Sequence, residues 1–147
     1  MVSGGQTGAD RAALDVALDL GIACGGWCPR GRMAEDGVLD MRYPLTETPR
    51  RQYIQRTEWN VRDSDGTLIV ARPPLSGGTA ATESLARTRG KPCLVVHPDD
   101  DEWRATLRTW LEANDIAVLN IAGPRESSGD LPYAATERLL RGLFDGG

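Results

Sequence analysis

The amino-acid sequence predicts an α/β protein, an open and mostly parallel sheet of about five strands with helices on both faces. Apolar runs of strand length alternate along the chain with helical patterns, which is typical of βαβ units. Three of these runs are continuously apolar, as strands buried on both faces should be: residues 68–71, 93–96 and 116–119. These observations favour a parallel sheet at the centre of the protein.

The other elements follow in order along the chain. Only Met1 and Val2 precede the first glycine-rich turn, so we expect a first strand that either is short or begins upstream of Met1. The spacing of apolar residues predicts a helix over residues 9–20 that ends at Gly21. Residues 25–45 are rich in glycine, proline and charge, and we expect a long loop beside the sheet edge. Further helices are expected at residues 48–61, 80–89, 103–111 and 133–143.

Length and composition fit one domain. The chain has 147 residues, of which 40% are hydrophobic and 26% are charged, which is ordinary for a globular protein. No linker or repeat divides it, so we expect residues 1–147 to form a single ligand-binding domain. The formal net charge of -4 disfavours nucleic acid as a partner, because nucleic-acid-binding proteins usually carry a basic face.

Cysteine usage and hydropathy indicate a cytoplasmic protein without a membrane partner. Three cysteines are an odd and sparse number, which favours a reducing compartment over a disulfide framework. No apolar run is long enough to span a bilayer, and the N-terminus has no leader-like region. Cys24, Cys28, Cys93 and His97 have the residue types of a zinc site. Because Cys93 and His97 lie on or just beyond a strand, with Cα atoms about 13 Å apart, we predict no metal site.

Three glycine-rich turns each join the end of a predicted strand to the start of a helix: residues 3–11, 76–79 and 122–128. In a parallel sheet, all such turns lie at the edge formed by the carboxyl ends of the strands. Helix N-termini, hydroxyl groups and arginine side chains there all favour an anion. The turns therefore predict one phosphate-binding site, with the candidate residues Ser3, Gly4, Gly5, Gln6, Thr7, Gly8, Asp10, Arg11, Ser76, Gly77, Gly78, Thr79, Gly123, Arg125, Glu126 and Ser127.

The turns also exclude two common phosphate ligands. None has the Gly-Lys-Ser/Thr of a P-loop or the spacing of the dinucleotide fingerprint, so ATP and NAD are not expected. Aspartate in place of Gly5 or Gly78 is expected to abolish phosphate binding, by clash and charge repulsion, while leaving the fold intact.

Motifs along nearly the whole chain resemble those of one known family. They are SGGQTGADR at residues 3–11, GGWCP at 25–29, AEDG at 34–37, YPL at 43–45, EWNVRDSD at 58–65, LSGGT at 75–79 and NIAGPRES at 120–127. On these motifs the sequence resembles the molybdenum carrier protein family, whose members carry molybdenum cofactor.

The resemblance implies a Rossmann-like fold, related to the phosphoribohydrolase and lysine-decarboxylase-like superfamily. It implies binding of molybdenum cofactor (molybdopterin), assembly into homo-oligomers and molybdenum-cofactor-dependent enzymes as partners. It also makes Arg32, Glu35 and Asp36, in the long loop, candidate ligand contacts. The cofactor holds its metal through its own dithiolene, so the protein need not supply metal ligands. A carrier performs no chemistry, and the favoured prediction is a non-catalytic protein with no catalytic residues.

Two alternatives stay open. The related phosphoribohydrolases resemble one another through Pro-Gly-Gly-x-Gly-Thr-x-x-Glu, whose glutamate is catalytic. Aligned on Gly78 and Thr79, that glutamate position falls on Thr82, and Glu83 lies about 100° further around the helix. This departure disfavours hydrolysis. A nucleoside-monophosphate N-glycosidase would use Glu35, Asp36 or Glu83, with Asp10 as a further acid or base. A sensor of a nucleotide-like ligand is the other alternative.

Overall fold

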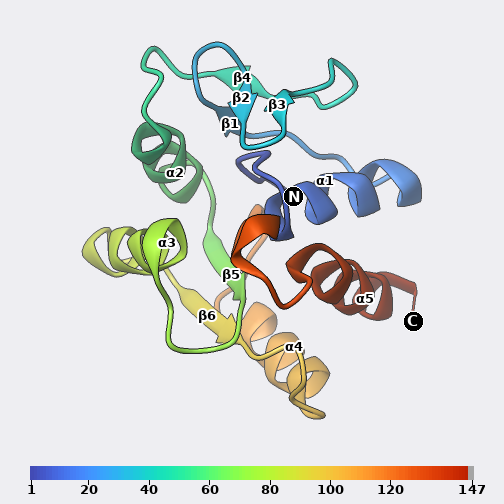
Figure 1. Ribbon diagram of the computed structural model, residues 1–147. Coiled ribbons are helices and arrows are strands. Elements are labelled where there is room, and N and C mark those ends of the chain that lie inside the picture. The colour runs from blue at the N-terminus through green and yellow to red at the C-terminus, as the bar shows by residue number, and fades with distance from the viewer. Residues whose placement is uncertain (146–147) are drawn as a thin grey trace.

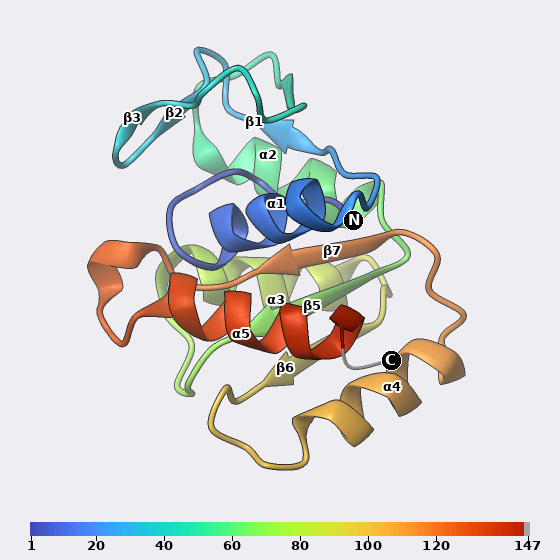
Figure 2. The same cartoon turned by 90° about the vertical axis from the view of Figure 1, so that its right-hand side faces the viewer.

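A parallel sheet of three strands runs through the centre of the computed structural model, which describes residues 1–145 (Figures 1 and 2). The strand order is β6-β5-β7, where β5 is Gly66–Val70, β6 is Cys93–Val96 and β7 is Leu119–Ala122. Val2 extends the sheet beyond β7 through single bridges to Asn120 and Gly25. The predicted α/β class is confirmed. The central sheet has fewer strands than expected, because the first segment contributes only Val2 before the chain turns.

Helices cover both faces of the sheet, as predicted (Figure 1). One face carries α1 (Ala9–Leu20), α4 (Trp103–Ala113) and α5 (Pro132–Asp145), and the other carries α2 (Tyr53–Arg62) and α3 (Gly77–Thr88). Successive side chains of β5 point to opposite faces of the sheet. Leu68 and Val70 therefore belong to one buried cluster and Ile69 to another. No helix within residues 1–145 has the length and apolar character needed to cross a lipid bilayer.

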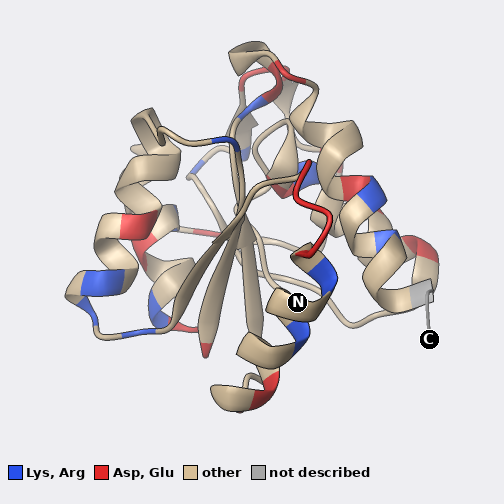
Figure 3. Cartoon of the chain, turned by 90° about the horizontal axis from the view of Figure 1, so that it is seen from below, with Lys and Arg blue, Asp and Glu red and all other residues tan. Residues whose placement is uncertain are grey.

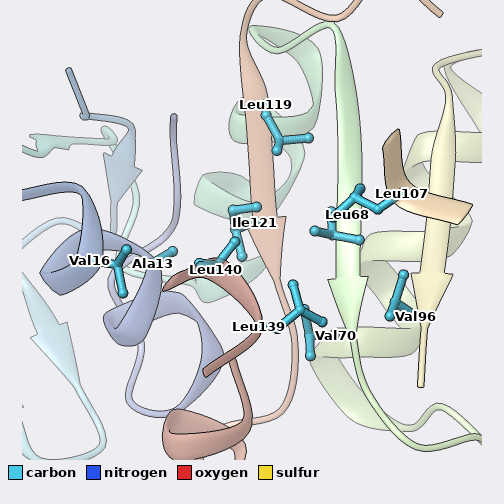
Figure 4. Packing of buried hydrophobic residues seen from close by; sticks show 10 residues of the cluster. All are labelled: Ala13, Val16, Leu68, Val70, Val96, Leu107, Leu119, Ile121, Leu139 and Leu140. Atoms are coloured by element: carbon cyan, nitrogen blue, oxygen red, sulfur yellow. The ribbon is translucent and has the colours of Figure 1, made fainter. Parts of the chain in front are cut away.

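The main core lies between the sheet and α1, α4 and α5 (Figure 4). Leu68, Leu107, Ile121 and Leu140 are fully buried there and come from four different elements. Burial of each such side chain contributes roughly 1.5–3 kcal/mol. The core therefore fixes where the strands end and where the following turns begin.

Several boundaries differ from the predicted ones. Helix α2 begins at Tyr53 rather than residue 48, because the Thr48 hydroxyl donates to the carbonyl of Arg50 and holds a turn there. Strand β7 begins at Leu119 rather than residue 116. Asp65 accepts the N–H groups of residues 117 and 118 at 3.1 and 2.7 Å, which keeps that stretch outside the sheet. Helix α3 begins at Gly77, earlier than the predicted residue 80.

Residues 25–45 are more ordered than the predicted loop. β1 (Trp27–Cys28) pairs in parallel with β4 (Thr46–Glu47), and β2 (Met33–Ala34) forms an antiparallel hairpin with β3 (Gly37–Val38). The guanidinium of Arg32 donates to the carbonyl oxygens of Leu45, Asp40 and Tyr43 at 2.9–3.1 Å. This segment therefore packs as a small layer against α1, through buried side chains that include Leu14, Cys28, Leu39, Tyr43 and Leu45.

Charged side chains do not form one basic face in the view from below (Figure 3). Lys and Arg are distributed over several helices, and acidic residues 99–102 form a continuous stretch before α4. Arg72 pairs with Asp99 of this stretch at 3.0 Å. Acidic residues outnumber basic ones, which gives the chain its net charge of -4.

Candidate functional site

The three glycine-rich turns open onto one cleft of about 640 Å³ at the carboxyl ends of β5 and β7. Topology alone predicts this convergence, since parallel strands end at a common edge. Helix α2 and the start of α5 supply further walls. Of the predicted phosphate-site residues, those that line the cleft are Gly4, Gln6, Asp10, Ser76, Gly77, Gly78, Thr79, Gly123 and Arg125.

The N-terminus of α3 forms one wall of the cleft. Ser76 is the N-cap residue, and its side chain makes no capping hydrogen bond. Gly77, Gly78 and Thr79 form the first helical turn and line the cleft. The first N–H groups of a helix have no partner within the helix, and the helix dipole adds positive potential. This wall is therefore suited to a phosphate or another anion.

Arg56, on α2, is a cleft residue that the sequence interpretation missed. Arg56 is 8% exposed and lines the cleft, and within residues 1–145 it forms no salt bridge, although its charge acts on the carboxylate of Asp10 in the same cleft. Nη1 donates to the carbonyl of Gly4 at 2.7 Å, and Nε donates to Thr57 Oγ1 at 3.2 Å. Arg56 and Asn60 lie four residues apart, so the helical spacing puts them on the same face of α2. Both line the cleft, and this shared face is the signal in the sequence that could have identified Arg56.

Asp10 brings a buried carboxylate to the same cleft. It lies in the first turn of α1 and is 8% exposed. Burial raises the pKa of Asp10 from its ordinary 3.8 to about 6, although the charges of Arg56 and Arg11 and the N–H of Gln6 lower it. A carboxyl group with a raised pKa in a cleft marks a candidate ligand or proton-transfer group.

Glu35 lies outside the cleft lining and joins two of the turns. Its carboxylate accepts hydrogen bonds from the hydroxyl of Thr7, from the N–H of Ser127 at 3.0 Å and from the hydroxyl of Ser127 at 2.6 Å. These bonds, those of Ser127 first, hold the pKa of Glu35 below its usual range. Thr7 Oγ1 also accepts the N–H of Glu126 at 3.1 Å. Glu35 thus fastens the hairpin to the first and third turns.

Arg11 and Asp36 form a second contact between the first turn and the hairpin. The guanidinium of Arg11 contacts both carboxylate oxygens of Asp36 at 2.9 and 3.0 Å, and also donates to the carbonyl of Gly5. The Arg11 side chain holds the pKa of Asp36 below its usual range. Arg11, Arg32, Glu35 and Asp36 therefore have protein partners in the structure, and contact of any of them with a ligand stays a prediction.

Two glycines of the first turn serve the fold rather than an open ligand surface. Gly5 has φ +77°, and a Cβ atom there would lie 2.7 Å from Leu45 Cδ1. Gly8 has φ +80°, and a Cβ atom there would overlap the carbonyl of Pro124. A side chain at Gly5 is therefore strained, and Gly5→Asp is expected to disturb the fold as well as binding. Gly78 is different, because a Cβ atom there meets nothing within 4 Å.

The candidate catalytic residues of the enzyme alternative, Glu35, Asp36 and Glu83, do not line the cleft. Glu83 pairs with Arg87 at 3.1 Å and, like Glu35 and Asp36, is not among the residues that line the cleft. Thr82 does line it, and its hydroxyl donates to the carbonyl of Gly78 at 2.8 Å. Within residues 1–145, no group of three or more His, Cys, Asp or Glu is placed to hold a metal ion. Asp10 and Asp130 are the acidic residues that line the cleft, and of the two Asp10 is the buried one.

The fold and the cleft define a Rossmann-like α/β protein with a ligand-binding edge at the carboxyl ends of its strands. The model of the circularly permutated YpsA SLOG family matches residues 1–144, and the chain belongs to this family. The chain is also similar to the crystal structure of a protein named "putative molybdenum carrier protein" from Syntrophus aciditrophicus SB. Their TM-score is 0.92 at 50% sequence identity, over 97% of this chain and 92% of that chain. None of the curated proteins compared with the chain matches it.

Proposed function

We propose that the protein is a non-catalytic carrier that binds molybdenum cofactor, or a closely related phosphorylated pterin, in the carboxyl-edge cleft. The observation that carries the proposal is Arg56, a buried cation without a salt bridge in residues 1–145, in the same cleft as the open N-terminus of α3. A buried charge is costly unless a partner compensates it. Asp10 acts on this charge without forming a salt bridge, so a phosphate monoester would supply the direct partner, and the name of the Syntrophus protein supports a molybdenum-related ligand.

The size and chemistry of the cleft fit such a ligand. Its volume of about 640 Å³ lies within the usual range of small-molecule sites, roughly 300–1,000 Å³. The phosphate would lie on Gly77, Gly78 and Thr79 beside Arg56, with Arg125 at the rim. The flat pterin would occupy the part of the cleft beside the first turn. The dithiolene of the cofactor would hold the metal, so the protein would not need to supply metal ligands.

The proposal extends to the location, the oligomeric state and the partners of the protein. We infer a cytoplasmic carrier that forms homo-oligomers and delivers its ligand to molybdenum-cofactor-dependent enzymes. The fastening of the hairpin by Glu35 and Asp36 supports a role in holding a ligand, because it fixes the turns before the ligand arrives. Preorganisation of this kind lowers the entropic cost of binding.

A nucleoside-monophosphate N-glycosidase is the second candidate function, and Asp10 is the observation that favours it. A carboxyl group with a pKa near 6 is suited to general acid or base catalysis at neutral pH. The phosphate of a nucleotide would use the same α3 wall. In this candidate, Asp10 replaces Glu35, Asp36 and Glu83 in the catalytic role. A nucleotide sensor would use the same cleft without turnover.

Native mass spectrometry of the protein, purified from a host that makes molybdenum cofactor, tests the proposal. A bound mass of a molybdopterin species is expected, with nucleoside monophosphates left intact in parallel incubations. Release of free base from any nucleotide would favour the glycosidase instead.

Gly78→Asp tests the position of the phosphate. Because Gly78 has open space around it and a carboxylate in the first helical turn favours the helix, the variant should fold normally. Charge repulsion should lower affinity for the phosphorylated ligand by at least about tenfold. Gly78→Ala is the matched control and should bind like the wild type. Equal binding by Gly78→Asp and wild type would place the phosphate elsewhere.

A further inference from the structure

The buried carboxylate of Asp10 has no cation in direct contact. Within residues 1–145 it forms no salt bridge. The charged groups that act on it are Arg56, from α2, and Arg11, from its own helix. Arg11 is in bidentate contact with Asp36, and Arg56 donates to Gly4 and Thr57. Asp10 therefore lies in a cleft suited to anions without a contact that neutralises it.

Asp10 retains acceptor capacity that the protein does not use. An ionised carboxylate has two oxygen atoms and about four acceptor positions. The protein donor that acts on it is the backbone N–H of Gln6. The carboxylate lines the cleft, where a ligand that supplies N–H groups can occupy the remaining acceptor positions. A phosphate cannot do so, because it carries the same sign of charge.

These observations divide the cleft into two ends with different chemistry. The α3 end, with Gly77, Gly78 and Thr79, offers N–H groups to an anion. The α1 end, with Asp10, offers a buried acceptor. A ligand that satisfies both ends carries a phosphate at one end and neighbouring N–H donors at the other.

We propose that Asp10 selects the ring of the ligand by accepting two parallel hydrogen bonds, one from a ring N–H and one from the adjacent exocyclic amino group. This 2-amino-4-oxo edge is shared by pterins and guanine. Adenine lacks it, because its corresponding ring nitrogen is an acceptor that a carboxylate repels. The inference rests on the proposed function and assigns its specificity to one residue, so that the protein takes phosphorylated ligands with a cyclic guanidine edge.

Titration calorimetry with a graded set of ligands tests the inference. The set is neopterin monophosphate, GMP, IMP, AMP and ribose 5-phosphate, at a pH above 7. IMP keeps the ring N–H but lacks the amino group, so it removes one of the two hydrogen bonds. GMP is expected to bind tighter than IMP, and IMP tighter than AMP, by about tenfold at each step, as for hydrogen bonds to a charged group.

A comparison of neopterin monophosphate with GMP shows whether the preferred ring with the 2-amino-4-oxo edge is a pterin or a guanine. Tighter binding of neopterin monophosphate assigns the edge to a pterin, and tighter binding of GMP assigns it to a guanine nucleotide. Either result supports selection by Asp10, provided that AMP and ribose 5-phosphate bind more weakly than both.

Asp10→Asn isolates the carboxylate. The amide has nearly the same shape but a single acceptor oxygen and no charge, so the ratio of GMP to AMP affinity should fall toward one. Asp19→Asn is the matched control, because Asp19 is exposed on the same helix and pairs with Arg141 away from the cleft. This control should keep the wild-type ratio.

The pH dependence of the same ratio gives a readout that needs no variant. The N–H donors of GMP bind the ionised form of Asp10, so the ratio should rise as pH rises through about 6. Arg56 and Arg11 keep their charge over this range. The phosphate titrates equally in GMP and AMP and cancels from the ratio.

The outcomes separate the inference from the proposed function. If none of the phosphorylated ligands binds, ribose 5-phosphate included, the proposed function is overturned and the inference with it. If they bind with equal affinity, or if Asp10→Asn keeps the wild-type ratio, the inference alone is overturned.

Discussion

Arg56 of α2 donates a hydrogen bond of 2.7 Å to the carbonyl of Gly4, which lies 52 residues earlier in the first glycine-rich turn. The guanidinium also stacks on the ring of Tyr53, with 5.2 Å from Cζ to the ring centroid. Its fork carries five N–H donors, so these contacts leave donors for a ligand. One side chain therefore holds the first turn in place and gives the cleft its buried positive charge.

Arg56→Met is expected to lower affinity for a phosphorylated ligand by at least about tenfold, because a charge-assisted contact to phosphate is lost. The methionine keeps an unbranched apolar stem. Arg56→Lys keeps the charge but not the fork, and should recover part of the affinity. Titration calorimetry with ribose 5-phosphate measures both variants. Arg51→Met, at an exposed arginine just before α2, is the control. Unchanged affinity in Arg56→Met would remove this side chain from the site.

The sequence predicts the glycine-rich turns that line the cleft, but it does not predict that Arg56 lines it. The turns around Gly4, Gly77 and Gly123 were found because glycine clusters after apolar runs, and topology brings such turns together. Arg56 was missed because its role depends on how α2 lies against the first turn, which no local pattern encodes. For the same reason, the contacts of Glu35 with Thr7 and Ser127 could not be read from the chain.

The shifted start of β7 has a similar cause. Residues 116–119 are as apolar as a buried strand, and the predicted boundary followed that run. The side chain of Asp65, more than 50 residues away, accepts two backbone N–H groups just before Leu119 and delays the strand. A distant polar contact thus overrides the local apolar signal.

Gly8→Ala is expected to destabilise the fold by at least about 2 kcal/mol, because it combines a left-handed backbone with overlap on the Pro124 carbonyl. Gly21→Ala is the milder comparison, because Gly21 has ψ 25° in the left-handed helical region, whereas Gly8 has ψ -132°. Gly21 also has positive φ, at +70°, but open space around it, so this variant should lose only about 1–2 kcal/mol. Urea unfolding measures both. A loss in Gly8→Ala no larger than that in Gly21→Ala would contradict the added cost expected at Gly8.

Glu35→Gln is expected to lower the Tm by a few degrees at neutral pH, because the amide cannot accept all the hydrogen bonds that Thr7 and Ser127 donate to the carboxylate. The pKa of Glu35 in the folded protein lies below its ordinary 4.5. Its contribution is therefore complete above pH 4.5 and is lost as pH falls through the lower, folded value. Thermal melts across this range should show the difference in Tm closing on the acid side.

Glu112→Gln is the control for that experiment, because Glu112 is an exposed glutamate on α4, far from the turns. Its Tm should follow that of the wild type at every pH. A difference between wild type and Glu35→Gln that stays constant down to the lowest pH would contradict a role for the charge of Glu35.

Asp10→Asn is expected to stabilise the ligand-free protein above pH 6, by roughly 1–3 kcal/mol. Burial raises the pKa of Asp10 from 3.8 to about 6, so the folded protein binds a proton more tightly than the unfolded chain does. The free energy of unfolding of the wild type should therefore fall as pH rises from 3.8 to about 6, and level off above. The variant has no charge to bury.

Urea unfolding of wild type and Asp10→Asn at several pH values measures this difference, with Asp19→Asn as an exposed control on the same helix. The difference in free energy of unfolding between Asp10→Asn and wild type should be largest above pH 6 and should disappear as pH falls toward 3.8. A gap independent of pH would mean that packing, rather than the buried charge, separates the two proteins. Combined with weaker binding of GMP relative to AMP, a pH-dependent gap would identify Asp10 as a residue that costs stability in the free protein and provides specificity in the complex.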